Sequence, residues 1–184
     1  MGRKEGVRIV AIVEDQRLER FVRKTLEEFG VDSHKLRIRP DYPKGGHGSG
    51  KQFVEKKYRE EIVTYRRNAD ENCALVLATD ADEQTVAQRR ARLDEQVAAI
   101  AQRPRETAEA IVYWIPKWHV ETWGLHLTGN RVDENTNYKS EGKDIRWDDA
   151  ADRFRQEYLE SKKPAMTTIP SLEQAYVETR RLRF

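Results

Sequence analysis

The stretch ALVLATDADE, residues 74–83, decides the fold of this chain. Its first five residues are apolar without a break, as in a strand that is buried on both faces of a parallel sheet. Asp80 and Asp82 follow at the carboxyl end of that strand, where open α/β sheets place their ligands. Two carboxylates that converge on one point repel each other unless a cation lies between them, and oxygen ligands suit Mg²⁺ or Mn²⁺. The alternative is an ordinary turn or a helix N-cap, where Asp is common.

The composition indicates a folded domain with a modest core. Hydrophobic residues make up 38% of the 184 residues and charged residues 36%, so the chain is polar but keeps strong apolar segments. The net charge of +2 argues neither for nor against a nucleic-acid partner. No apolar run approaches membrane-spanning length, and the charged residues 1–6 are not followed by a signal-type segment. We therefore expect a cytoplasmic protein without a membrane partner.

Apolar periodicity predicts a regular alternation of strands and helices. We expect strands at residues 7–13, 35–39, 74–78 and 110–115, and helices at residues 16–29, 51–67, 85–102, 117–127, 147–161 and from 171 onward. This order predicts an α/β fold, with a parallel four-stranded sheet and helices on both faces. Residues 1–130 are expected to form that domain, and residues 131–184 a loop and a C-terminal helical extension.

Two further acids stand near the ends of other predicted strands. Glu14 follows the first strand, and Glu121 comes shortly after the fourth. Glu14 alone would be explained as a helix-start acid that is stabilised by the macrodipole. Because the carboxyl ends of parallel strands share one edge of the sheet, we expect Glu14, Asp80, Asp82 and Glu121 to border one cleft.

A glycine-rich segment, KGGHGSGKQ at residues 44–52, precedes the second predicted helix. Gly45, Gly50 and Lys51 fit the GxxxxGK pattern of a P-loop, but Gln52 stands where a Ser or Thr would hold Mg²⁺, so we reject that interpretation and expect no ATP binding. The segment is either a phosphate-sized anion site built from backbone N–H groups or a simple connection. The residues expected to bind phosphate there are Gly46, Gly48, Ser49 and Lys51.

Basic residues on two predicted helices are candidate contacts for a polyphosphate backbone. Lys51 and Lys56 lie on the helix at 51–67, and Arg89 lies in the first half of the helix at 85–102. A basic helix beside a carboxylate cluster provides what DNA or RNA needs for binding. The alternative is a solvated charged face.

Other candidates lie around the fourth strand. His119, Glu121 and His126 do not have the spacing of a metalloprotease motif, and packing or surface roles are expected for the histidines. Three tryptophans could stack on nucleobases. Core roles are expected for two of them, Trp114 and Trp123, which leaves Trp118 open.

The order of the acids resembles the TOPRIM domain of topoisomerases, bacterial primases and OLD-type (overcoming lysogenization defect) nucleases. The likeness rests on the strand ending in Glu14, the strand ending in Asp80-x-Asp82, and their spacing. The segment 115–123, IPKWHVETW, is similar to the "LPxxxIE" segment of OLD-like nucleases. The resemblance covers residues 7–127. It implies a four-stranded sheet, two Mg²⁺ or Mn²⁺ ions and chemistry on phosphodiesters.

The resemblance also implies roles for single residues. Glu14 matches the family's glutamate, a general acid/base or metal ligand, and Asp80 and Asp82 match the DxD metal ligands. Glu121 matches the further acid of the nuclease branch, so all four acids are expected as catalytic residues and metal ligands. Lys117 could add charge stabilisation during hydrolysis, or could be an ordinary surface lysine. The chain departs from the family at Asp15, where many members have glycine.

The functional expectation is a metal-dependent nuclease that cleaves DNA or RNA. The chain lacks the ATPase half of OLD proteins, which leaves open a separate ATPase subunit and a role as the effector of an antiviral defence system. The alternatives are a non-catalytic TOPRIM-like module that binds nucleic acid or a protein partner, and an unrelated α/β domain in which the DxD is a cap. The sequence does not indicate the oligomeric state.

Overall fold

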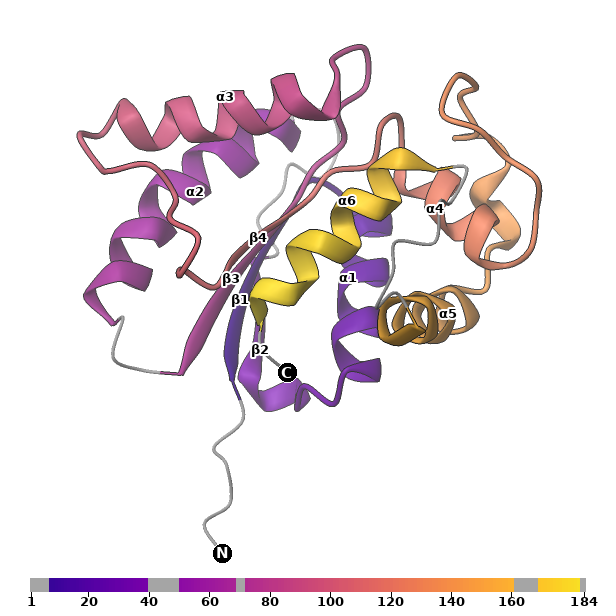
Figure 1. The fold of residues 1–184 in the computed structure, drawn as a ribbon, viewed down its shortest axis with the longest axis horizontal. Helices are drawn as coiled ribbons and strands as arrows, with labels where there is room; N and C mark the ends of the chain where they lie inside the picture. The colour runs from indigo at the N-terminus through magenta and orange to yellow at the C-terminus, as the bar shows by residue number, and fades with distance from the viewer. Residues whose placement is uncertain (1–6, 40–49, 69–71, 161–168, 183–184) are drawn as a thin grey trace, which may run out of the picture.

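The computed structural model describes residues 7–39, 50–68, 72–160 and 169–182, and these form an α/β fold (Figure 1). The four strands are β1 (Arg8–Val13), β2 (Leu36–Arg39), β3 (Cys73–Ala78) and β4 (Ile111–Trp114). The six helices are α1 (Gln16–Glu28), α2 (Gly50–Arg67), α3 (Val86–Ala98), α4 (Val120–Leu127), α5 (Trp147–Glu160) and α6 (Pro170–Thr179). Short 3₁₀ turns are η1 (Ser33–Lys35), η2 (Gly142–Asp144) and η3 (Arg180–Leu182). The predicted alternation is confirmed, with shifts of a few residues at element ends.

The strands form one parallel sheet in the order β2-β1-β3-β4, which confirms the predicted four-stranded parallel sheet. The two central strands, β1 and β3, pair over their whole length, with Val13 opposite Ala78. The ladder continues past the strand ends, because the N–H of Glu14 donates to the carbonyl of Ala78 at 3.1 Å. The residues that follow β1 and β3 therefore emerge side by side.

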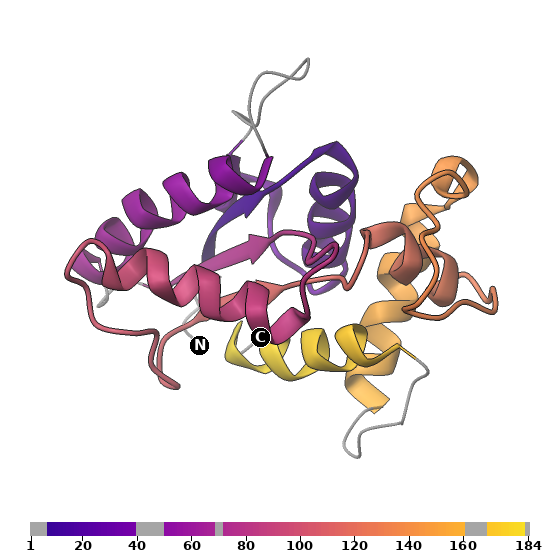
Figure 2. The ribbon, with the colours of Figure 1, turned by 90° about the horizontal axis from the view of Figure 1, so that it is seen from above.

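Helices cover both faces of the sheet. Figure 1 shows α2 and α3 on one side and α1, α4, α5 and α6 on the other, and Figure 2 shows α2 and α3 lying side by side. Alternate strand residues serve the two cores, since successive side chains of a strand point to opposite faces. Ile9, Ala11 and Val13 of β1 belong to the core under α1, whereas Ile12 belongs to the core under α2 and α3.

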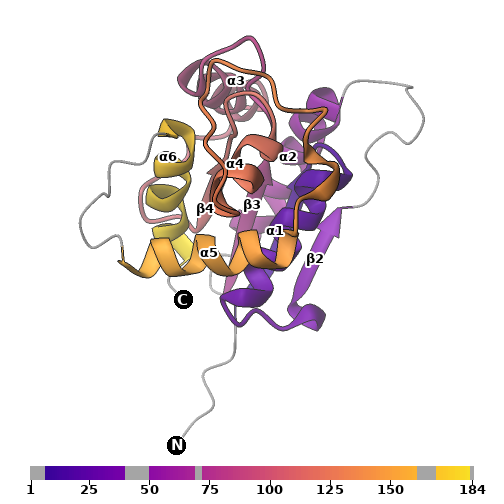
Figure 3. The ribbon, with the colours of Figure 1, turned by 90° about the vertical axis from the view of Figure 1, so that its right-hand side faces the viewer.

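The helices after residue 130 pack into the core on the α1 side of the sheet. Figure 3 shows α5 lying across α1, and Phe154 of α5 packs edge-on against Phe21 of α1, with ring centroids 5.6 Å apart. Trp114 of β4 also contacts Phe154, at 5.5 Å, and is fully buried. Within the described ranges, no helix has the length and apolar character needed to cross a bilayer.

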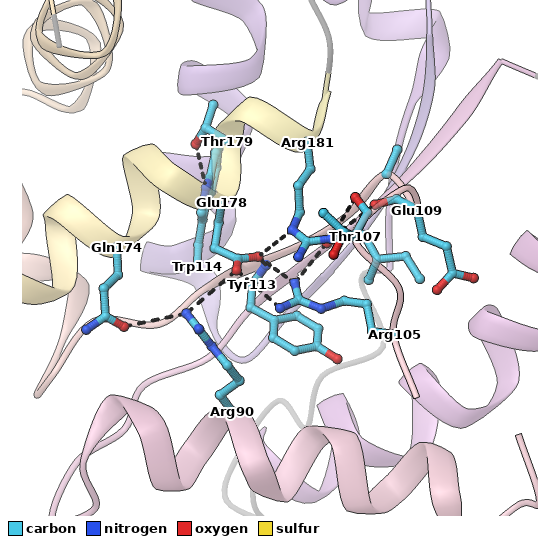
Figure 4. A network of polar contacts seen from close by, with 12 residues as sticks. Arg90, Arg105, Thr107, Glu109, Tyr113, Trp114, Gln174, Glu178, Thr179 and Arg181 are labelled. Carbon is cyan, nitrogen blue, oxygen red and sulfur yellow. Dashed lines mark hydrogen bonds and ion pairs between the residues drawn. The ribbon is translucent and has the colours of Figure 1, made fainter. Parts of the chain in front are cut away.

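A polar network attaches α6 to β4 (Figure 4). The buried carboxylate of Glu178 accepts a hydrogen bond from the backbone N–H of Tyr113, at 3.1 Å, and two from the guanidinium of Arg105. At the next residue of α6, the indole N–H of Trp114 donates to Thr179 Oγ1 at 3.0 Å. A buried charge is tolerated when it is paired and hydrogen-bonded in this way. The network therefore holds the C-terminal helix against the edge of the sheet.

Candidate metal centre

Three side chains at the carboxyl edge of the sheet can hold a metal ion. Asp80, Asp82 and His119 each offer one ligand atom, and these atoms all lie within 4.8 Å of one another. His119 Nδ1 is 2.9 Å from Asp80 Oδ2 and 3.7 Å from Asp82 Oδ1. Two carboxylates and an imidazole are a ligand set suited to a divalent metal.

Local backbone structure brings the three residues together. The turn after β3 is fastened to the segment after β4, because the N–H of Ala81 donates to the carbonyl of Pro116 at 2.9 Å. Asp82 has a φ of 54°, in the left-handed region that Asp tolerates better than most residues. His119 is the N-cap residue of α4 but makes no side-chain cap hydrogen bond, so its ring is available to Asp80.

The environment of Asp80 fits a cation. Asp80 is 5% exposed, and its Oδ1 is buried without a hydrogen-bond partner. Burial raises the pKa of Asp80 well above its usual value, and repulsion from Glu14, Asp15 and Asp82 raises it further. An unsatisfied buried carboxylate oxygen is costly for a folded chain. A bound divalent ion would satisfy this oxygen.

The environment of His119 favours the neutral imidazole. Burial lowers the pKa of His119, and Lys139 lowers it further, against an opposing effect of Asp82. A neutral imidazole is the ligand form. His119 Nδ1 and Asp80 Oδ2, 2.9 Å apart, are within hydrogen-bond distance, and burial moves the pKa values of the two groups in opposite directions, each toward its neutral form.

Glu14 lies beside the group of three without being a member of it. Its Oε2 accepts hydrogen bonds from the hydroxyl of Thr79, at 2.6 Å, and from the backbone N–H of Asp80, at 3.0 Å. Burial raises the pKa of Glu14, and these two hydrogen bonds oppose the rise. A β-carbon on Gly50 would lie 2.6 Å from Glu14 Cγ, so the start of α2 can pack this closely only because residue 50 is glycine. The hydrogen bond between the Asp80 N–H and the Glu14 carboxylate shows that these two residues are adjacent, as expected.

Arg89 has a different position from the one expected. It was predicted to bind nucleic-acid phosphate, yet it is only 2% exposed. Its guanidinium donates to Glu55 at 2.6 Å and to Thr79 Oγ1 at 3.0 Å. Thr79 in turn donates to Glu14, so Arg89 belongs to a buried chain of hydrogen bonds that fixes the Glu14 carboxylate. The neighbouring Arg90 is more exposed than Arg89.

Glu121 is likewise outside the group of three. It is 2% exposed and forms an ion pair with Arg17 of α1. Gly142 packs against it, since a β-carbon there would lie 2.2 Å from Glu121 Cγ. Arg17 also donates to the carbonyl of Lys139 at 3.0 Å. Glu121 thus contributes to the contact between α1, α4 and the long loop after α4.

Two lysines contact Asp82. Lys51, in the first turn of α2, places its Nζ 2.6 Å from Asp82 Oδ2, and Lys117 Nζ donates to the backbone carbonyl of Asp82. A cavity of about 540 Å³ opens beside these residues. It is lined by Lys51, Glu55, Ala81, Asp82, Glu83, Gln84, Arg89, Arg92, Trp118, His119 and Asn137.

The remaining phosphate-binding candidates are only partly covered by the structure. Gly46, Gly48 and Ser49 lie outside the described residues, as does Gly45 of the rejected P-loop pattern. Lys56 is exposed on α2 and does not line the cavity. The prediction of an anion site in the glycine-rich segment therefore stays a prediction.

Sequence reasoning missed His119, for which a packing or surface role was expected. The residue lies three positions after Pro116, which is bonded to the turn that carries Asp80 and Asp82. Two adjacent strand ends in a parallel sheet bring their following residues to one place, and this rule could have identified the histidine. The residue was missed because the spacing of His119, Glu121 and His126 does not match a recognised metal-binding motif.

Comparison of the chain with protein-family models, with curated proteins and with solved structures found no match. The resemblance to the TOPRIM domain thus stays a prediction. The α/β fold and the group formed by Asp80, Asp82 and His119 are the structural facts from which a function can be inferred.

Proposed function

We propose that this protein is a divalent-metal-dependent nuclease that hydrolyses phosphodiester bonds of DNA or RNA. The observation that carries the proposal is the buried Asp80 carboxylate, which has one oxygen without a hydrogen-bond partner. The ligand atoms of Asp80, Asp82 and His119 lie within 4.8 Å of one another. The group lies at the carboxyl edge of a parallel sheet, the usual place for a site in this class of fold. A cavity beside it offers access to a substrate.

The residues of the site would have two roles, metal binding and stabilisation of negative charge. Asp80, Asp82 and His119 would hold the ion, which when bound supplies positive charge to the transition state of hydrolysis. Lys51 and Lys117 hold Asp82 in place, and their charges would also lie near a phosphate bound at the ion. A pentavalent phosphate carries more negative charge at its equatorial oxygens than the ground state, so fixed cations there favour the reaction.

Glu14 is the candidate for proton transfer or for a second ion. It adjoins Asp80, and its orientation is fixed by the hydroxyl of Thr79. Burial raises its pKa, which brings the carboxyl closer to the range useful for general acid/base catalysis. This role, the TOPRIM identity, a separate ATPase subunit and a place in antiviral defence are parts of the proposal that follow from the resemblance.

The test combines metal binding with cleavage. The wild type, Asp80→Ala and Glu28→Ala should be titrated with Mn²⁺ by calorimetry and assayed on plasmid, linear DNA and RNA, each with and without metal. Glu28 is an exposed acid on α1 that does not line the cavity, and it is the control. We expect Asp80→Ala to lose both metal binding and cleavage, and Glu28→Ala to keep both. Retained metal-dependent cleavage in the Asp80→Ala protein would refute the assignment.

A further inference from the structure

The three tryptophans around the fourth strand have different environments. Trp114 and Trp123 are fully buried in the core, which confirms the role expected for them. Trp118 is only partly buried, and it lines the cavity beside the metal centre. It precedes His119 directly, so an aromatic ring and a metal-ligand candidate reach the same cavity from adjacent positions.

The ring of Trp118 is held in a fixed orientation. Its indole N–H donates to the carbonyl of Glu134 at 3.0 Å, and the Glu134 side chain accepts a hydrogen bond from the N–H of Ser171, at 2.9 Å, at the start of α6. Lys117 Nζ lies over one face of the ring, 4.2 Å from its centroid, in cation–π contact, so a base would stack on the opposite face. An aromatic surface that is already ordered loses little conformational entropy when a ligand stacks on it.

The cavity is not a basic patch. Its lining carries three cationic side chains, Lys51, Arg89 and Arg92, and three carboxylates, Glu55, Asp82 and Glu83. Two of the cations are already paired at 2.6 Å, Arg89 with Glu55 and Lys51 with Asp82. With the lining balanced in formal charge, non-specific attraction for a polyanion is weak. Affinity for a nucleic acid would therefore need the metal centre and contacts to the bases as well as to phosphate.

We propose that Trp118 is a stacking platform for an unpaired nucleobase, so that the substrate of this site is single-stranded nucleic acid. The proposal rests on the nuclease function proposed above and names its substrate class. The faces of a base inside a duplex are covered by its neighbours, so only an unstacked base can place its face on the ring. The cavity volume, about 540 Å³, is in the range of sites that enclose a small ligand.

The experiment compares two probes that differ only in the base. Deoxyadenosine 5′-monophosphate and deoxyribose 5-phosphate carry the same phosphate and sugar, and neither holds a phosphodiester bond that a nuclease could cleave. Binding to the full chain in the presence of Mn²⁺ is measured by calorimetry. We expect the nucleotide to bind about 5- to 100-fold more tightly than the sugar phosphate, which is the range of base–aromatic stacking.

Three variants test whether the preference for the nucleotide depends on Trp118. Trp118→Ala should bind both probes equally, while Trp118→Phe, which keeps a ring but loses the indole N–H, should retain part of the preference. Tyr138→Ala removes an aromatic residue of the loop after α4 that does not line the cavity, and should behave like the wild type. Melting temperatures establish that each variant is folded, and the Phe variant serves if the Ala variant is not.

The outcomes separate this inference from the proposed function. Equal affinity of the wild type for the two probes would overturn the stacking subsite, even if metal-dependent cleavage is observed. A base preference that survives in Trp118→Ala would also overturn it. If no nucleic acid is cleaved but the preference depends on Trp118, the subsite stands and the nuclease proposal fails.

Discussion

His119 Nδ1 lies 2.9 Å from Asp80 Oδ2, although the two residues are 39 positions apart in the chain. The contact joins the end of β3 to the start of α4. It leaves the second oxygen of Asp80 buried without a partner. This pair makes the site chemically unusual, because a stable fold normally satisfies its buried carboxylates. The following predictions test what the pair and its surroundings do.

Asp80→Asn should stabilise the metal-free protein at pH 8. The substitution removes a buried carboxylate that carries an unsatisfied oxygen and is repelled by Glu14, Asp15 and Asp82. The expected gain in free energy of unfolding is about 1 kcal/mol or more. The measurement is chemical denaturation of both proteins in the presence of a chelator. A variant that is less stable than the wild type at this pH would show that Asp80 is a structural residue.

The stabilising effect of Asp80→Asn should shrink as the pH falls. The pKa of Asp80 is higher in the folded protein than its ordinary value of 3.8, so folding favours the protonated form. The cost of the charged form is therefore fully present above the folded-state pKa and disappears as the pH falls through it toward 3.8. The difference between wild type and variant, measured from pH 8 to about pH 4.5, isolates Asp80 from other titrating groups.

The site should prefer Mn²⁺ to Mg²⁺. Imidazole nitrogen is a better ligand for transition metals than for Mg²⁺, which favours oxygen. We expect at least about tenfold tighter binding of Mn²⁺ by the wild type, and a smaller preference in His119→Ala. Calorimetric titrations with each ion measure both values. An unchanged preference in the variant would remove His119 from the ligand set.

Lys51→Met should strengthen metal binding. The Lys51 ammonium lies 2.6 Å from Asp82 Oδ2 and competes electrostatically with any cation at that carboxylate. Because the contact is partly exposed, we expect a modest increase in Mn²⁺ affinity, about threefold or more. Lys56→Met is the matched control, since Lys56 is exposed on the same helix and does not line the cavity. Equal effects of the two substitutions would argue against a direct role of Lys51.

Glu121→Gln should lower stability without changing metal affinity. Glu121 is buried in an ion pair with Arg17. Because the substitution removes the charge of Glu121, we expect the free energy of unfolding to fall by about 1–3 kcal/mol. Asp82→Asn should show the reverse pattern, with a loss of Mn²⁺ binding and a small change in stability. Denaturation curves and calorimetric titrations of both variants measure these effects. Loss of metal binding in Glu121→Gln would return this residue to the ligand set that its sequence position predicted.

The sequence by itself determined the architecture and the edge of the sheet that carries the site. The apolar runs at 7–13 and 74–78 set the two central strands, because such runs form strands buried on both faces. Glu14 and Asp80 follow those runs directly. Their proximity could therefore be predicted from strand order alone, since parallel neighbours end at one edge.

Only the tertiary structure decided which side chains meet at that edge. Glu121 and His119 are two residues apart, yet one is paired with Arg17 and the other reaches Asp80, because the start of α4 turns them in different directions. The placement of Arg89 was decided in the same way, since Glu55 and Thr79 are its partners only after α2, α3 and β3 have packed. Side-chain direction depends on long-range packing, which local sequence patterns do not encode.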